Sequence, residues 1–361
     1  MAAQSVSGNN GAGLYLFSLN LFTGALTQIA IVMEGTSQVP SPSWLALHPN
    51  GKYLYTTNEI TTGSVSAFSI NPTTGALTLL NVQSSNGSGP AHCSVDPLGQ
   101  FVFVANYDSG SVAVLPINSN RSLKPYSDFI QDVDNVGPTT ATDAPPGSFA
   151  ISGHDAPHAH MIQADNAGKY VFHTDLGQDR VYSWILNRSA GTLSPNTPPF
   201  ISVPPGDGPR HFVFHPNNKW FYLLTEEAST VIFYDYDAAT GTLSQQQMVS
   251  ALPPGFVGTS FGSEIRISPD GRFLYAANRL HDTIAIFAIG PTGQLTHLSE
   301  VSTLGDYPRS FTIDPTASFL VSCNQRSDAL TTYRFDPVLG GFTFTGQYTP
   351  VGAAASIVFL T

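Results

Sequence analysis

PHAHMIQADNAGKYVFHTDL, residues 157–176, contains two apolar runs on either side of a turn sequence. Alternating apolar and polar residues are typical of strands, and Asp and Gly between two such runs indicate a tight turn. The stretch therefore predicts a strand, a turn and a second strand. Five other segments share this outline: SPSWLALHPNGKYLYTTNE (41–59), GPAHCSVDPLGQFVFVANY (89–107), GPRHFVFHPNNKWFYLLTE (208–226), GSEIRISPDGRFLYAANR (262–279) and YPRSFTIDPTASFLVSCNQ (307–325).

The six segments keep one spacing without gaps. The residue that opens each turn and the residue that ends the second strand are ten positions apart in every copy. The turn residues are His48, Asp96, Asp165, His215, Ser268 and Asp314, and the strand ends are Asn58, Asn106, Asp175, Thr225, Asn278 and Asn324. Most copies continue into a third alternating run and a fourth strand. Four strands at a period of about 45–50 residues are typical of a β-propeller blade.

The two ends of the chain supply the rest of a ring. GLYLFSLNLFTGALT near the N-terminus matches the third and fourth strands of a blade, and AAASIVFL near the C-terminus matches a first strand. Strands from both termini would close the ring and remove its exposed sheet edges. We therefore expect an all-β, seven-bladed β-propeller with four antiparallel strands per blade, in one domain over residues 1–361. Six blades with frayed ends are the alternative. Residues 1–13 are expected to form a flexible leader and residues 126–154 a long inserted loop.

Composition narrows the possible partners. The chain has 25 acidic and 14 basic residues, a net charge of -11, and no Lys/Arg cluster that would hold a nucleic acid, so we expect none as a partner. Its longest apolar runs are far below the ~18 residues that span a bilayer, so no membrane partner is expected. The first residues lack the features of a signal peptide, which predicts a cytoplasmic protein, or a secreted one if a signal peptide has been removed. Cys93 and Cys323 are interpreted as buried thiols.

The repeat also places charged residues around one mouth of the central channel. The first strand of a propeller blade lines the channel and the second runs antiparallel to it, so the start of one and the end of the other share a face. Five residues before the turn residue stand Ser43, Ala91, His160, Arg210, Ser263 and Arg309, and eleven after it stand Glu59, Tyr107, Leu176, Glu226, Arg279 and Gln325. A blade repeated only for structure has no need of Arg where a sister blade has Ser or Ala. This concentration predicts a site that binds an anionic group.

Other interpretations of these residues stay open. Neighbouring Arg and Glu side chains can form an ion-pair network that only fills the channel. The histidines of HDAPHAH (154–160) suggest a metal, but their spacing is no known zinc pattern and the arginines would repel a cation, so we expect neither a metal nor a cofactor. Asp96, Asp165 and Asp314 are expected to cap their own turns.

The motifs PHAH, TDLGQDRVYSW, GPRHFVFHP, TEEASTV and EIRISPDGRFLYAANR resemble the seven-bladed propeller lactonase family, in order and over nearly the whole chain. That family includes bacterial 6-phosphogluconolactonase-type proteins and the fungal 3-carboxy-cis,cis-muconate lactonizing enzyme. By similarity to the latter, the catalytic positions fall on His160, Arg210, Glu226 and Arg279. From the repeat, we expect the residues around them to bind the substrate: His158, Asp175, His211, Glu264, Arg309 and His92.

Three functions follow from this pattern. The first is metal-independent hydrolysis of a small anionic or sugar lactone, with Glu226 or His160 as general base and the arginines stabilising the oxyanion. The alternative is cyclisation of a carboxymuconate-type dienoic acid, in which the arginines pair with carboxylates and the same His or Glu delivers a proton to carbon. The third is a non-catalytic binding or interaction propeller, because a fold does not by itself select a function.

Overall fold

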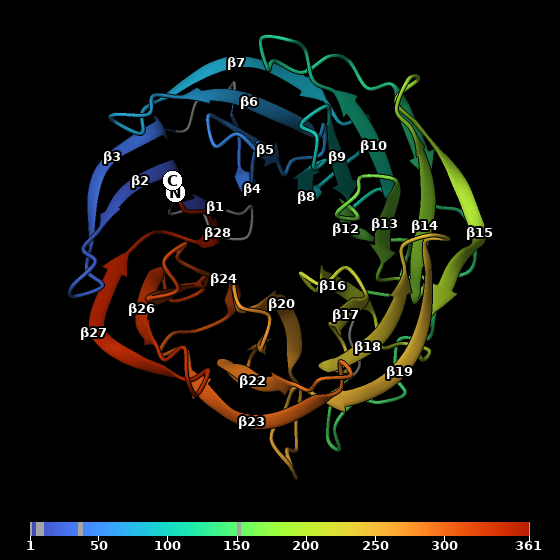
Figure 1. The fold of residues 1–361 in the computed structure, drawn as a ribbon, viewed down its shortest axis with the longest axis vertical. Coiled ribbons are helices and arrows are strands. Elements are labelled where there is room, and N and C mark those ends of the chain that lie inside the picture. Colours follow the sequence, from blue (N-terminus) through green and yellow to red (C-terminus); the bar gives the residue numbers. More distant parts are fainter. Residues whose placement is uncertain (1, 5–10, 35–38, 150–152, 361) are drawn as a thin grey trace.

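The computed structural model describes residues 2–4, 11–34, 39–149 and 153–360. Within these ranges the regular structure is β-strand alone, in seven four-stranded antiparallel sheets. Figure 1 shows the sheets arranged in a ring around a central axis, with the colours passing in sequence order from blue to red. The predicted all-β propeller is confirmed. No helix among these residues is long and apolar enough to cross a membrane.

Six sheets contain one copy each of the repeated segment, with the four strands in sequence order from the channel outward. The inner strands are β4 (Pro42–Leu47), β8 (Pro90–Val95), β12 (Ala159–Ala164), β16 (Pro209–Phe214), β20 (Phe261–Ile267) and β24 (Pro308–Ile313). The second strands are β5 (Tyr53–Asn58), β9 (Phe101–Asn106), β13 (Tyr170–Asp175), β17 (Trp220–Thr225), β21 (Phe273–Arg279) and β25 (Phe319–Asn324). The third strands are β6 (Ser64–Ile70), β10 (Ser111–Pro116), β14 (Arg180–Asn187), β18 (Thr230–Asp237), β22 (Thr283–Ile289) and β26 (Ala329–Phe335). The outer strands are β7 (Leu77–Ser84), β11 (Asp128–Gln131), β15 (Thr192–Ser202), β19 (Thr242–Ser250), β23 (Leu295–Ser302) and β27 (Phe342–Pro350).

The remaining sheet joins the two ends of the chain. Its strand order is β28 (Ala354–Ile357), β1 (Ala2–Gln4), β2 (Gly13–Leu19) and β3 (Leu26–Glu34), and β28 pairs with β1 in antiparallel register. In Figure 1 the red end of the chain lies beside the first blue strands. The expected leader over residues 1–13 therefore contains a strand, which was missed because three residues are too few to show an alternation. Residues 1 and 5–10 of that leader lie outside the described residues.

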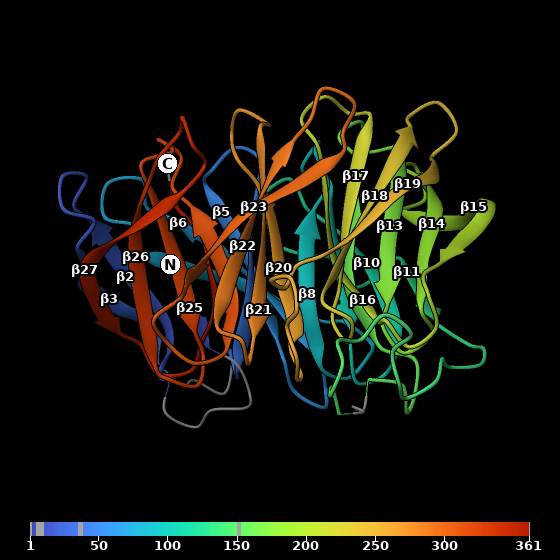
Figure 2. The same cartoon turned by 90° about the horizontal axis from the view of Figure 1, so that it is seen from below.

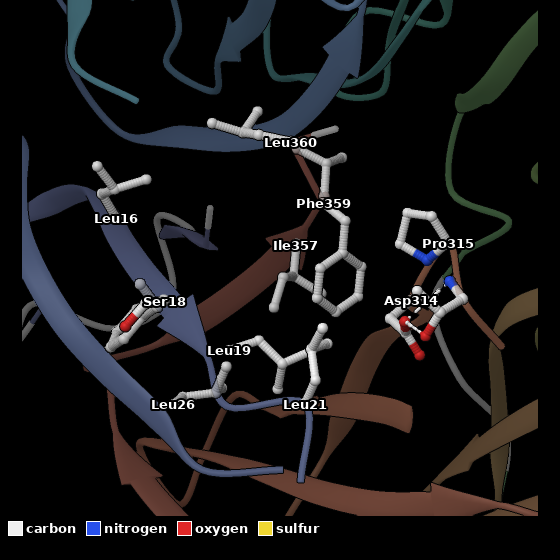
Figure 3. Close-up of a pocket in the computed structure, with 13 residues that line it drawn as sticks. Leu16, Ser18, Leu19, Leu21, Leu26, Asp314, Pro315, Ile357, Phe359 and Leu360 are labelled. Carbon is white, nitrogen blue, oxygen red and sulfur yellow. Dashed lines mark hydrogen bonds between the residues drawn. The ribbon is translucent and has the colours of Figure 1, made fainter. Parts of the chain in front are cut away.

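An apolar pocket of about 430 Å³ lies at this closing sheet. Figure 3 shows Leu19, Leu21 and Phe359 around it, with Asp314 and Pro315 at one side. The Asp314 carboxylate accepts hydrogen bonds from the backbone of its own turn, at 2.7 Å from Ser318 N. We therefore assign this pocket to packing between the closing sheet and its neighbour.

The turns of the repeat show why the spacing is constant. Asp96 Oδ1 accepts the backbone N–H of Phe101 at 2.8 Å, and Asp165 Oδ1 accepts that of Tyr170 at 3.1 Å. A carboxylate in this position satisfies donors at the start of the second strand and fixes the number of residues in the turn. The predicted capping of these turns is confirmed.

The predicted long loop of residues 126–154 differs from the structure at its start, because it includes the strand β11. The connection between β11 and β12 begins after Gln131 and ends before Ala159. Asp128–Gln131 form β11, which pairs with β10. DFIQ is too short, and too polar at its ends, for a strand to be recognised from alternation. Residues 132–149 and 153–158 lie along the face on which the inner strands begin, the lower edge in Figure 2.

Backbone hydrogen bonds attach this connection to the rims of neighbouring sheets. Gly137 N donates to Gly177 O at 2.8 Å, and Thr142 N donates to Pro205 O at 3.0 Å. Residue 205 lies between β15 and β16, so the connection covers part of the mouth face.

Candidate functional site

Each of the six repeated inner strands has one extra residue at the same point. In β16 the pairing with β17 passes from Pro209 to His211, which leaves Arg210 unpaired. His160 and Arg309 are the equivalent bulged residues of β12 and β24. Strands β4, β8 and β20 shift register at the same place. A bulge bends the strand and redirects a side chain. Here it directs the bulged residue, such as Arg210, to the mouth of the channel, and the next residue, such as His211, to the level below the mouth.

Glu226 lies between two arginines at the mouth. Its Oε2 is 2.8 Å from Arg210 Nε and 2.6 Å from Arg279 Nη2. Burial acts to raise the pKa of Glu226, but the two arginines outweigh it and hold that pKa below its ordinary value. Burial, and then repulsion by Arg279, lower the pKa of Arg210. Since one carboxylate faces two guanidinium groups, the cluster as a whole favours an additional negative charge.

The backbone of β20 holds both arginines in place. Arg210 Nη1 donates to the carbonyl oxygen of Ser263, and Arg279 Nη2 donates to that of Gly262 at 3.0 Å. The side chains of Arg210 and Arg279 are 2% and 7% exposed, whereas that of Glu226 is 16% exposed. The backbone of β20 therefore holds both guanidinium groups in position. Solvent reaches the cluster mainly at the Glu226 carboxylate.

His160 faces the same mouth. Its ring lies 5.0 Å from that of His211 and 5.4 Å from that of Tyr107, measured between centroids. Burial, followed by the positive charge of Arg210, lowers the pKa of His160 well below its ordinary value. Its Nδ1 has no hydrogen-bond partner among the described residues. The imidazole is therefore neutral near pH 7 and can accept a proton.

Tyr307 lies beside this cluster, and the sequence did not single it out. Tyr307 OH accepts a hydrogen bond from Arg279 Nη1 at 3.2 Å, and the guanidinium lies 5.0 Å from the tyrosine ring centroid. Tyr307 has a φ of 63°, a conformation that glycine adopts at the equivalent positions Gly89 and Gly208. The sequence could have indicated a functional role for Tyr307, because the equivalent position of two sister blades is glycine. A strained backbone conformation is retained where the side chain has a role.

Glu227 is a second residue that the sequence did not single out. Burial, and then the charge of Glu226, raise its pKa to about 7. It lines a small pocket together with Thr139, Ala144 and Phe149 of the long connection. The adjacent glutamates of TEEAST therefore differ in their protonation, and Glu227 is the one that the connection covers.

His158 and Asp175 support the rim of the mouth. The His158 ring stacks on Tyr107 at 4.3 Å between centroids, and its Nε2 lies 2.8 Å from Asp155. Asp175 is fully buried and accepts the backbone N–H groups of His158 and Gln178. Both hydrogen bonds are made to Oδ1 and hold the backbone of the rim, and the predicted part of Asp175 in substrate binding stays a prediction.

Arg309 pairs with a carboxylate from the far side of the closing sheet, because Glu59 follows β5 and the sheet of β28 and β1–β3 lies between the two. Its Nη2 lies 3.2 Å from Glu59 Oε2, and each of the two side chains is 15% exposed. Arg309 adds to the positive charge that acts on His160. It therefore belongs to the same mouth as Arg210 and Arg279.

Three aromatic rings meet below the arginine cluster, within the channel. Trp44 lies 4.8 Å from His92 and 5.1 Å from His211, and the two histidines are 5.6 Å apart, all measured between ring centroids. These residues come from three different inner strands, so we name them the aromatic layer. His92, together with Glu264, lines a cavity that continues toward the turns at the other face. His92, His211 and Glu264 were predicted to bind substrate at the mouth, but they lie in the aromatic layer or at this cavity. In each of these strands the bulge directs the preceding residue to the mouth.

No group of three or more His, Cys, Asp and Glu side chains in the described part of the chain is arranged to hold a metal ion. Cys93 and Cys323 are both buried and unpaired with each other, as expected.

Comparison with known proteins identifies the family. A family model described as "Lactonase, 7-bladed beta-propeller" matches residues 2–359. The 6-phosphogluconolactonase of Bacillus subtilis is 34% identical over 351 residues, which cover 96% of this chain and 94% of that protein. The 6-phosphogluconolactonase of Formosa agariphila is 32% identical over 370 residues, with 97% and 96% covered. The solved structure of the periplasmic gluconolactonase of Pseudomonas aeruginosa matches with a TM-score of 0.89 at 28% identity, covering 100% of this chain and 98% of that one. The chain belongs to the lactonase family of 7-bladed β-propellers.

Proposed function

We propose that this protein hydrolyses a small anionic or sugar lactone, without a metal ion, at the mouth that contains Arg210, Glu226, Arg279 and His160. The observation that carries the proposal is the pair of buried arginines that share a single carboxylate beside a neutral histidine. A lactone carbonyl develops negative charge when water attacks it, and fixed positive groups stabilise that charge.

In this mechanism His160 is the general base. It removes a proton from a water molecule while the water oxygen forms a bond to the carbonyl carbon, and it returns the proton to the ring oxygen as the carbon–oxygen bond breaks. Glu226 is less suited to this role because two guanidinium groups engage its charge, whereas Nδ1 of His160 has no hydrogen-bond partner among the described residues. We assign Glu226 to positioning the arginines.

Arg279 supplies the donor to the developing oxyanion. Its Nε–H makes no hydrogen bond to any residue that the structure describes, whereas its other nitrogens are bound to Glu226, Gly262 and Tyr307. Arg210 and Arg309 then attract the negative group of the substrate. Removal of one such donor typically lowers kcat by about 10²- to 10³-fold.

The names of the relatives favour opening of a lactone over its formation. The Bacillus subtilis and Formosa agariphila proteins are 6-phosphogluconolactonases, so a phosphorylated sugar lactone is the first substrate to try. The net positive cluster at the mouth is compatible with a phosphate on the substrate. The cytoplasmic location and the absence of a cofactor stay predictions.

The test is turnover by the purified protein at neutral pH. Opening of 6-phosphogluconolactone and of a panel of aldonolactones releases acid, which a pH indicator follows against the spontaneous reaction. We expect a rate well above background for the wild type and a rate close to background for His160→Gln. If the wild type opens no lactone faster than background, the proposal is wrong.

A further inference from the structure

A second cavity occupies the channel on the other side of the aromatic layer. It measures about 380 Å³, and residues of the inner strands β4, β8, β12, β16 and β20 line it. Trp44 and His92 lie at its inner end, and Gln163 and Asn166 lie toward the turns. This volume is within the range of about 300–1,000 Å³ that is usual for small-molecule sites. We call it the turn-side cavity.

Glu264 gives the turn-side cavity a buried acceptor that the protein leaves unused. Its side chain is 4% exposed, and Oε2 has no hydrogen-bond partner among the described residues. Oε1 is 3.3 Å from Arg266 Nε, and that nitrogen also makes no hydrogen bond to the described residues. A buried polar atom without a partner costs free energy, so this carboxylate oxygen is suited to a ligand that donates a hydrogen bond.

The charges of the cavity limit the class of ligand. The Glu264 carboxylate disfavours an anion, and the Arg266 guanidinium next to it disfavours a cation. A purely apolar ligand would leave Oε2 without a partner. A neutral ligand with neighbouring hydroxyl groups meets all three conditions, because one hydroxyl donates to Glu264 while the next accepts from Arg266.

The aromatic layer complements such a ligand. Trp44 and His92 present ring surface at the closed end of the cavity, 4.8 Å apart between centroids. Ring surfaces of this kind cover the C–H groups of a ligand while the polar side chains orient it. We propose that the turn-side cavity is a second binding site, distinct from the arginine mouth, for a neutral polyhydroxylated molecule of monosaccharide size.

The test is direct binding of D-glucose and D-glucitol to the full chain, with cyclohexanol as a control that lacks neighbouring hydroxyls. Saturation-transfer NMR detects binding, and tryptophan fluorescence places it, because Trp44 is one of three tryptophans and Trp44→Phe removes its signal. We expect both polyols to bind the wild type and to change the Trp44 fluorescence, and cyclohexanol to bind more weakly.

Two isosteric variants separate the sites. Glu264→Gln changes the turn-side cavity, and Glu226→Gln changes the arginine mouth. We expect Glu264→Gln to weaken glucose binding by about tenfold or more, the usual loss for a hydrogen bond to a charged group, while Glu226→Gln retains the wild-type affinity. Absence of glucose binding by the wild type, or binding lost in Glu226→Gln and kept in Glu264→Gln, would overturn the proposal.

A further pair of variants covers the case in which Glu264→Gln does not fold. Gln163→Ala and Asn166→Ala remove side chains near the opening, where Asn166 is exposed and Gln163 is half-buried. We expect each to weaken glucose binding several-fold, and unchanged affinity in both would also refute the site. None of these measurements reads lactone turnover, so their failure leaves the proposed function standing.

Discussion

Replacement of Glu226 by Gln separates a catalytic cluster from an ion-pair network that only fills the channel. The substitution keeps the size of the side chain and removes its charge. In the wild type the Glu226 carboxylate lies 2.8 Å from Arg210 Nε and 2.6 Å from Arg279 Nη2. In the variant the two arginines face each other in a buried site without that negative charge. Both stability and turnover should change.

The expected loss of stability follows from the burial of the cluster. Removing one partner of a buried ion pair costs about 3–5 kcal/mol. Unfolding entropy of about 2.1 cal/mol/K per residue, applied to 361 residues, gives about 0.76 kcal/mol/K for the chain. The melting temperature of Glu226→Gln should therefore fall by about 4–7 °C.

The pH dependence of this difference identifies the charge as its cause. The two arginines hold the folded-state pKa of Glu226 below its ordinary value of 4.5, although burial opposes them. The stabilisation is thus fully present above the unfolded-state pKa and is lost as pH falls through the folded-state pKa. Wild type and variant should differ fully at pH 7 and converge in acid.

Differential scanning calorimetry at pH 7 and at lower pH, together with lactone turnover, tests this reasoning. Glu59→Gln is the matched control, because Glu59 pairs with a single arginine at 3.2 Å and is as exposed as Glu226. We expect a smaller fall in melting temperature for this control. For Glu226→Gln we expect kcat/KM to fall by about 10²-fold, because the arginines lose their orientation. A lower melting temperature with full turnover would show that the cluster is only structural, and an unchanged melting temperature would refute the energetic argument.

Three further variants test other parts of the mouth. His160→Gln should lower kcat/KM by about 10²- to 10⁴-fold and remove the acid limb of the pH–rate profile. In the wild type, burial and Arg210 place that limb well below pH 6.5. An acid limb that persists in the variant would exclude His160 as its source. Arg279→Lys should lower kcat/KM by about 10²- to 10³-fold with the fold retained, because one ammonium cannot replace the planar guanidinium; near-normal turnover would contradict the role of its Nε–H. Burial and the negative charge of Asp143 raise the pKa of Asp207 to about 7, although the hydrogen bond from the Asp143 backbone N–H opposes them. Ionisation of Asp207 therefore weakens the attachment of residues 132–149, which is strongest in acid and is lost as pH rises from the ordinary pKa of 3.8 to about 7. Hydrogen exchange of that segment, corrected for the intrinsic rate, should rise between about pH 4 and about pH 7 in the wild type and lose this dependence in Asp207→Asn. The same rise in both proteins would refute it.

The sequence was informative where the repeat fixes the geometry. The constant distance between the turn residue and the end of the second strand reflects turn carboxylates such as Asp96, which bind the backbone of the next strand. That distance predicts Arg210, Glu226 and Arg279 at one mouth. The structure brings all three into contact. Their catalytic roles stay predictions.

The sequence was less informative where a single residue changes direction. Glu264 follows Ser263 directly, and from spacing alone both were expected at the mouth. One extra residue in β20 alters the pairing with β21 between Gly262 and Ile265, so Glu264 lines the turn-side cavity. A one-residue shift in a strand changes the side to which every following side chain points, and no property of the six segments taken singly reveals where that shift occurs.

The same bulges explain how one repeated strand can serve two sites. In β16 the bulged residue Arg210 joins the charged cluster, and the next residue, His211, joins the aromatic layer. Because six copies of the bulge lie at the same height, six inner strands can vary the residue at the mouth and the residue below it separately. A substitution of the residue at the mouth then leaves the contacts of the residue below it unchanged, and the reverse also holds. Across the six copies, Ser, Ala, His or Arg stands at the bulge and Trp, His, Met, Glu or Ser at the next position, so the two levels carry different chemistry.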